Sequence, residues 1–135
     1  MITTTHNPPD TAQFSTRRPA ASTVVIAAQG EIDAANAQEL VDYALRDGDS
    51  IKHLVLDLTD VEFFGTSGFS ALHMLSVRCA GNSITWAAVP SAAVSRLLTI
   101  CDPDSTLPFY GGVDSALSAA GGKPDRLLEL VPQPR

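Results

Sequence analysis

The sequence predicts a single α/β domain with a mixed, mostly parallel sheet of four to five strands and about four helices. Two observations support this class. Apolar or β-branched runs alternate with segments of helical periodicity, an order that calls for right-handed crossovers between parallel strands. Residues 54–58 are apolar at four of five positions, which is typical of a strand covered on both faces. The predicted order along the chain is β-β-α-β-α-β-α-β-α.

The chain has 135 residues, which is enough for one domain with a modest core. Residues 1–12 are polar and contain Pro8-Pro9, so we expect a flexible N-terminal tail. We assign residues 13–120 to the domain and residues 121–135 to a C-terminal tail.

The first elements form a predicted hairpin followed by a helix. Residues 13–18 are expected to form a short edge strand, and the β-branched run 23–28 a second strand that ends at Gln29-Gly30-Glu31. Asp33 is a good N-cap for the next helix, and Gly48 suits the C′ position after it. The apolar positions at helical spacing between them are Ala37, Leu40, Val41, Ala44 and Leu45.

The central stretch predicts a buried strand, a short loop and a helix. The strand covers residues 53–58, the loop covers residues 62–68, and the helix extends over about residues 67–80. The loop carries two adjacent hydroxyls, Thr66 and Ser67. A hydroxyl there lies at the positive end of the helix, above backbone N–H groups without an intrahelical partner.

Two further strand–helix pairs complete the predicted domain. Residues 83–89 predict a strand, and residues 93–101 predict a helix that stops at an Asp-Pro pair. Residues 107–110 predict a short strand, which a proline restricts to an edge of the sheet, and residues 113–120 predict a last helix.

Two loops are expected at the same end of the sheet. Functional loops of parallel sheets gather beyond the carboxyl ends of the strands. The loop of residues 30–33 follows the second strand and the loop of residues 62–67 follows the third, so the two are neighbours if these strands pair. We take the hydroxyl pair, Thr66 and Ser67, as the functional centre.

The net charge of −6 argues against a nucleic acid or an anionic membrane surface as the partner, because both need a basic patch. A basic partner surface suits the chain better. No apolar run approaches the roughly 18 residues that span a membrane, and the N-terminus has no secretory signal pattern. We therefore expect a cytoplasmic protein.

The sequence predicts a protein that is not an enzyme and needs no metal or cofactor. Residues 65–68 do not fit the Gly-x-Ser-x-Gly nucleophile elbow, and the later His73 lies on the following helix. No phosphate-binding glycine motif is found, and the three His and two Cys form no ligand cluster. Cys79 and Cys101 leave two hypotheses open, two buried reduced thiols or a redox pair.

Two segments resemble the signatures of STAS domains, the anti-sigma factor antagonists or anti-anti-sigma factors. The segment Gly30-Glu31-Ile32-Asp33, followed by Ala37 and Leu40, resembles the GELD-type segment of that family. Leu56-Asp57-Leu58, leading through Phe63 to Thr66-Ser67-Gly68, resembles the second signature, a strand followed by an Asp-Ser-Ser-Gly-like loop and a helix. The resemblance covers roughly residues 12–120.

The resemblance implies a STAS fold and a small protein-binding switch. Unphosphorylated members of the family bind a serine-kinase-type anti-sigma factor, which then releases its sigma factor. The kinase phosphorylates the first hydroxyl after the loop aspartate, and a phosphatase resets the cycle. Carried over to this sequence, the phosphoacceptor is Thr66, with Ser67 as the alternative.

The expected partner-binding residues cluster around this hydroxyl pair. They are Asp33, Glu62, Phe64, Gly65, Thr66, Ser67 and Gly68. Phe63 and Phe64 should point to opposite faces, one into the core and the other, which we assign as Phe64, toward the partner. Simpler roles remain open, since Asp33 and Ser67 are also good helix caps and the glycines suit special backbone conformations.

One position departs from the family pattern, because Gly65 stands where the family has the loop aspartate. The missing carboxylate affects the expectation of phosphorylation more than the expectation of binding. It keeps a second function open, a STAS scaffold or adaptor in a stress-signalling or transporter-associated assembly that is not phosphorylated.

Overall fold

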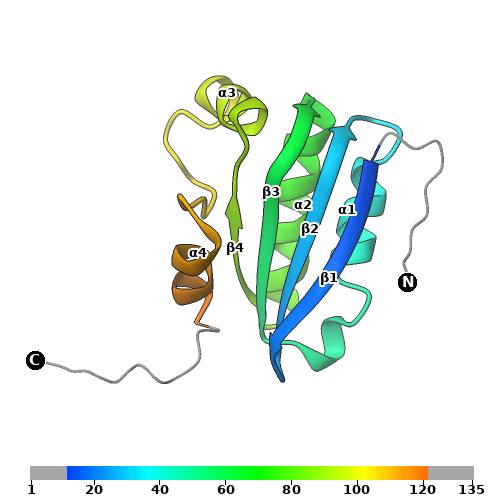
Figure 1. Ribbon diagram of the computed structural model, residues 1–135, viewed down its shortest axis with the longest axis vertical. Coiled ribbons are helices and arrows are strands. Elements are labelled where there is room, and N and C mark those ends of the chain that lie inside the picture. The colour runs from blue at the N-terminus through cyan, green and yellow to red at the C-terminus, as the bar shows by residue number, and fades with distance from the viewer. Residues whose placement is uncertain (1–11, 122–135) are drawn as a thin grey trace, which may run out of the picture.

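A four-stranded mixed sheet organises the computed structural model, which describes residues 12–121 (Figure 1). The strands are β1 (Ala12–Ala20), β2 (Thr23–Ile32), β3 (His53–Phe64) and β4 (Thr85–Val89), in the spatial order β1-β2-β3-β4. β1 pairs antiparallel with β2, whereas β2 with β3 and β3 with β4 are parallel. The predicted sheet class is therefore confirmed. The predicted tails lie outside the described residues, apart from their inner ends at Ala12 and Gly121.

Helices cover both faces of this sheet. They are α1 (Ala37–Ala44), α2 (Thr66–Gly81), α3 (Ala92–Cys101) and α4 (Val113–Ala120), with a 3₁₀ turn η1 at Gly48–Ser50. α1, α2 and α3 pack into the larger core on one face, while α4 packs on the opposite face over β3 and β4. Among residues 12–121, no helix combines the length and apolarity needed to cross a bilayer.

The apolar run at the centre of β3 is explained by its position between two cores. Leu54 and Leu56 point into the larger core, under α1 and α2. Val55 points into the smaller core under α4, together with Val25 of β2. Both faces of the strand are buried here, as the continuous run of apolar residues predicts.

The carboxyl half of β3 departs from simple alternation. From Leu58 onward every third residue is buried, and these residues are Leu58, Val61 and Phe64. The register with β2 shifts twice here, between the pairs Ala27–Asp57 and Gln29–Asp60 and again between Gly30–Val61 and Glu31–Phe63. Each shift is a bulge that inserts one extra residue into β3. The bulges keep the apolar residues inward and turn Thr59-Asp60 and Glu62-Phe63 outward.

Polar and backbone features accommodate these bulges. Asp57 Oδ1 accepts hydrogen bonds from the Thr59 N–H at 3.0 Å and the Thr59 hydroxyl at 2.7 Å. On β2, Gly30 has a φ of +97°, a left-handed conformation that favours glycine. The Leu-Asp-Leu signature thus contributes an aspartate that holds the first bulge.

Several predicted boundaries were wrong at the ends of elements. β2 continues through residues 29–32, and β3 runs to Phe64, so the predicted loop of residues 62–68 shortens to Gly65 alone. The segment 107–110 forms only an isolated bridge, Ala88 to Phe109, rather than a fifth strand. Gly48 opens η1 instead of ending α1.

Candidate functional site

The carboxyl ends of β2 and β3 are tied together where the candidate site begins. The Gly65 N–H donates to the Ile32 carbonyl oxygen at 3.0 Å, and Ile32 pairs with Phe64 in the sheet. Asp33 follows β2 and Thr66 opens α2, so both leave neighbouring strand ends. The predicted neighbourhood of the two signature segments is confirmed.

The two hydroxyls lie in the first turn of α2. Gly65 is the N-cap, with φ −87° and ψ 178°, and its carbonyl accepts from the Gly68 N–H at 2.9 Å. Ser67 is therefore not the helix cap, because it lies two positions inside the helix. Thr66 is exposed, whereas Ser67 is half-buried. Of the two hydroxyls, Thr66 is the more accessible to a partner or an enzyme.

The backbone around Thr66 is suited to an added anion. The N–H groups of Thr66 and Ser67 precede the first intrahelical hydrogen bond, which the Gly68 N–H makes. Such N–H groups, with the helix dipole, favour negative charge at the start of a helix. A phosphate on Thr66 is therefore compatible with the local fold.

Gly68 has a packing role that the sequence did not reveal. A Cβ atom at this position would lie 2.6 Å from Cε1 and 2.7 Å from Cζ of Phe64. Real Cβ contacts are not this short, so only glycine fits here without moving the Phe64 ring. Gly68 is buried and allows α2 to pack closely against Phe64 of β3, so it does not present a side chain to a partner.

The assignment of the two phenylalanines was wrong. Phe64 is only 4% exposed and belongs to the larger core, so it cannot anchor a partner. Phe63 is 51% exposed, because the second bulge turns it outward. The aromatic residue available to a partner beside Thr66 is therefore Phe63.

Asp33 organises the turn before α1 without being its N-cap. Its carboxylate accepts from the Ala35 N–H at 2.9 Å, and its own N–H donates to Asn36 Oδ1 at 3.0 Å. The Asn36 amide in turn donates to the Glu31 carbonyl at 2.9 Å. The helix begins at Ala37 with Asn36 as N-cap. Asn36, which sequence analysis missed, thus holds the first signature segment in place.

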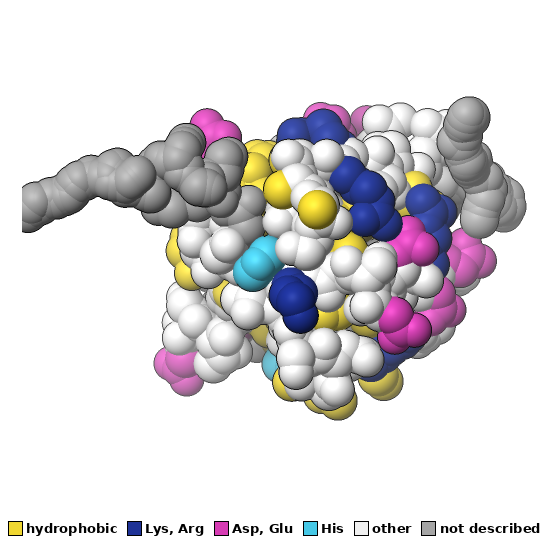
Figure 2. All heavy atoms as spheres, turned by 90° about the horizontal axis from the view of Figure 1, so that it is seen from below, with side chains coloured by type: hydrophobic (Ala, Val, Ile, Leu, Met, Phe, Trp, Pro, Cys, Tyr) yellow, Lys and Arg dark blue, Asp and Glu magenta, His cyan; other side chains and the backbone are white. Residues whose placement is uncertain are grey.

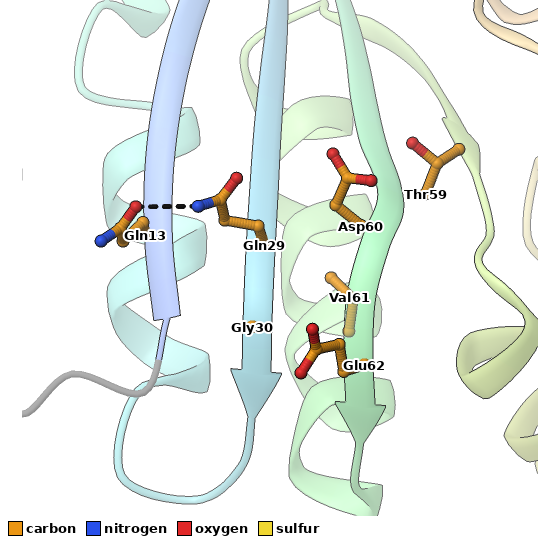
Figure 3. A pocket seen from close by; sticks show the side chains of 7 residues that line it. All are labelled: Gln13, Gln29, Gly30, Thr59, Asp60, Val61 and Glu62. Carbon is orange, nitrogen blue, oxygen red and sulfur yellow. Dashed lines mark hydrogen bonds between the residues drawn. The ribbon is translucent and has the colours of Figure 1, made fainter.

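Next to the junction, the outer face of the sheet has a polar hollow of about 560 Å³. Its lining residues are Gln13, Gln29, Gly30, Thr59, Asp60, Val61 and Glu62. Figure 3 shows the two glutamines on one side and the two carboxylates on the other, with Gly30 between them. Glu62, predicted as a loop residue, lies in β3 and is exposed.

Charge is distributed unevenly between the two ends of the sheet. Of the six Lys and Arg among the described residues, five lie toward the end where β2 and β3 begin (Figure 2). We call this the basic end, and its residues are Arg17, Arg18, Arg46, Lys52 and Arg78, of which Arg18, Arg46 and Arg78 form ion pairs with Asp47 or Asp42 at the same end. The opposite end, around Thr66, carries the carboxylates Glu31, Asp33, Asp60 and Glu62.

The two cysteines are not joined in a disulfide, and Cys79 is buried. Cys79 and Cys101 are both free, and burial raises the pKa of the Cys79 thiol to about 11. So little thiolate at neutral pH favours the hypothesis of reduced thiols over a redox pair. Within residues 12–121, no group of three or more His, Cys, Asp or Glu is arranged to hold a metal ion.

Comparison with known proteins matches this architecture to one family. A family model of the STAS domain matches residues 15–116. The chain is 33% identical over 111 residues to "Osmosensory protein A" of Mycobacterium tuberculosis, covering 79% of this chain and 70% of that protein. It is 34% identical over 102 residues to "Anti-sigma-F factor antagonist RsfA" of the same species, covering 73% and 80%.

A solved structure agrees with these sequence matches. The crystal structure of an anti-sigma factor antagonist from Mycobacterium paratuberculosis superimposes with a TM-score of 0.70 and 25% identity. The match covers 86% of this chain and 99% of that one.

Proposed function

The chain belongs to the STAS domain family, and from this premise we propose that it is an anti-sigma factor antagonist. It would bind a kinase-type anti-sigma factor and so free a sigma factor. The observation that carries this proposal is the exposed Thr66 at the start of α2, beside the turn held by Asp33. Relatives named as anti-sigma factor antagonists support the same role.

We propose that the unphosphorylated surface is the binding-competent one. Its centre is uncharged, since Thr66 follows Gly65 and the exposed ring of Phe63 lies close to that glycine. A large aromatic side chain beside a neutral hydroxyl is typical of a protein contact that becomes desolvated on binding. The function proposed is binding rather than catalysis.

Phosphorylation of Thr66 would switch this contact off. A phosphate adds about −1.5 to −2 charges at neutral pH. The free N–H groups of α2 would keep the domain folded, so the effect would fall on the partner, which would have to bury a dianion. Desolvating a charged group in an interface costs several kcal/mol, and the chain's own carboxylates Asp33 and Glu62 add repulsion, which together correspond to a loss of binding of about a hundredfold or more.

Gly65 bears on which kinase can act. A side chain here would meet the exposed Phe63 ring at 3.4 Å, and the backbone is extended, so an aspartate fits without strain. The glycine is therefore not required by the fold. We propose that the missing carboxylate alters recognition by the kinase, while a phosphatase would reset the switch as in the resembling family.

The proposal is tested with candidate kinase-type anti-sigma factors and calorimetry. We expect Thr66→Glu to bind at least about thirtyfold more weakly than the wild type, and Thr66→Val to bind nearly as well. Thr99→Glu, which adds the same charge to an exposed position on α3, is the matched control and should bind normally. Equal affinity of the wild type and Thr66→Glu would overturn the switch.

Phosphorylation itself is tested by incubation with the same factors and ATP. Mass spectrometry of the peptide that spans residues 53–78 would locate the phosphate on Thr66 or on Ser67. We expect Thr66, because Ser67 is half-buried. Binding without any phosphate on this peptide would leave the antagonist role in place and remove the kinase step.

A second candidate function rests on the match to the protein named "Osmosensory protein A". In this alternative the domain is a scaffold or adaptor in a stress-signalling assembly, and Thr66 is not modified. Affinity capture with the full chain separates the two functions, since a small ATP-binding kinase-like partner supports the first and a large homotypic assembly the second.

A further inference from the structure

The part of the sheet face that α4 leaves uncovered carries the polar hollow of about 560 Å³ described above. We propose that this hollow receives an arginine side chain of the partner protein when the partner binds over Thr66. The inference rests on the proposed function, because it adds a second contact to the same interface.

The hollow is built by the irregularities of β2 and β3. The bulge at Leu58-Thr59 turns Asp60 outward, and the shift after Gly30 turns Glu62 outward on the same side. Without these bulges, simple alternation would point Asp60 into the core. Gly30 has no side chain and leaves the space between the two carboxylates and Gln29 open (Figure 3).

The polar groups of the hollow are mainly hydrogen-bond acceptors. The Gln29 side chain donates one N–H of Nε2 to Gln13 Oε1 at 2.8 Å, and its carbonyl oxygen is a further acceptor beside its second N–H. Asp60 and Glu62 add two exposed carboxylates. A guanidinium group offers five donors in a planar fork and suits several acceptors at once better than a compact ammonium does.

The charge of the whole domain favours the same occupant. The described residues contain 12 Asp and Glu against six Lys and Arg, and five of those six cations lie at the basic end. The end with Thr66, which carries Glu31, Asp33, Asp60 and Glu62, is therefore negative. Such a field attracts a basic surface and fixes its orientation during approach.

The hollow is continuous with the proposed interface. Glu62 lies four residues before Thr66, and its neighbour Phe63 is the exposed aromatic residue. A standard protein interface covers about 800 Å² on each partner, so a partner that covers Thr66, Phe63 and Glu62 together would reach the hollow. The arginine would then add specificity for this chain, beside the contact with the hydroxyl.

The first experiment is an NMR titration of the full chain, labelled with ¹⁵N, with N-acetyl-arginine amide. N-acetyl-citrulline amide, which has a similar shape and no charge, is the control ligand. We expect backbone amide shifts at Gly30, Asp60 and Glu62 with the arginine compound only. The Asp60→Asn/Glu62→Gln variant should weaken this response by about 2- to 30-fold, while Asp104→Asn should not. Equal responses to the two compounds, or none to either, would overturn the proposal.

The second experiment uses an anti-sigma factor that the wild-type chain binds. Asp60→Asn/Glu62→Gln should lower the affinity about tenfold and reduce the dependence of the association rate on salt. Unchanged affinity in this variant would refute the arginine contact and leave the proposed antagonist role unaffected. The titration needs no anti-sigma factor, so its outcome is independent of whether the proposed function holds.

Discussion

Replacing Gly68 by alanine should destabilise the domain, although alanine is normally favoured in helices. In an open helical position the Gly→Ala change stabilises by about 1 kcal/mol. Here the new Cβ would meet Phe64 at 2.6 Å, and Phe64 cannot swing away because it is 4% exposed within the core. Overpacking of this kind costs about 1 to 3 kcal/mol. We expect a net loss of up to about 2 kcal/mol once the helix gain is subtracted.

Gly81→Ala provides the matched control on the same helix. Nothing lies within 4 Å of a Cβ at Gly81, so this change should be neutral or stabilising. Urea unfolding of both variants measures the difference, and the melting temperature of Gly68→Ala should fall by up to about 10 °C.

A second substitution tests whether the Phe64 ring is the cause. Phe64→Leu shortens the side chain, so Gly68→Ala should be less damaging in that background, and a double-mutant cycle measures the coupling. If Gly68→Ala stabilised the protein as Gly81→Ala does, the packing argument for this glycine would be refuted.

Three further changes test other parts of the structure. Gly65→Asp should stabilise the domain by a few tenths of a kcal/mol in urea unfolding, because it supplies an N-cap acceptor that Gly65→Ala does not. In the folded protein, Cys79 should resist iodoacetamide while the half-buried Cys101 reacts, as mass spectrometry would show. The free energy of unfolding should also fall as the pH rises from about 9 to 11, because in this range the Cys79 thiol ionises only in the unfolded chain. Hydrogen bonds from the Thr106 hydroxyl and N–H lower the pKa of Asp102. The ionised Asp102 carboxylate therefore stabilises the fold above about pH 4, and this stabilisation is lost as the pH falls further. Asp102→Asn should remove this acid dependence from urea unfolding measured between about pH 2.5 and 6.

The sequence predicted the sheet class because the signals for it are local. The apolar run of residues 54–58 and the alternation of strands with helices follow from which faces are buried, and the structure has both. The neighbourhood of Asp33 and Thr66 also followed, since parallel strands present their carboxyl ends on one edge.

The end of β3 could not be predicted in the same way. Burial of Leu58, Val61 and Phe64 has a period of three, which fits neither a regular strand nor a helix, so the sequence predicts a loop from residue 62 onward. The bulges that produce this period depend on pairing with β2 and on the φ of Gly30, which are properties of the folded sheet. The same uncertainty of register led to the prediction that Phe64, rather than Phe63, is the exposed residue.

Asn36 was missed for a different reason. An aspartate just before a helical pattern is a strong N-cap signal, and Asp33 satisfied it. The structure uses Asp33 one turn earlier, where its carbonyl accepts from the Ala37 N–H at 2.9 Å, and gives the N-cap position to Asn36. Only the reciprocal bonds between Asn36 and the backbone of Glu31 and Asp33 distinguish these two arrangements.

The bulges of β3 connect the fold to the proposed function. A regular strand would bury alternate residues up to Phe64 and expose no adjacent pair. Two bulges instead place Thr59-Asp60 and Glu62-Phe63 outward while Phe64 stays in the core and fixes Gly68 at the start of α2. The exposed aromatic, the carboxylates of the hollow and the position of Thr66 therefore depend on one irregular strand end. A change that removes a bulge, such as Asp57→Ala with its two lost hydrogen bonds to Thr59, should disturb all three together.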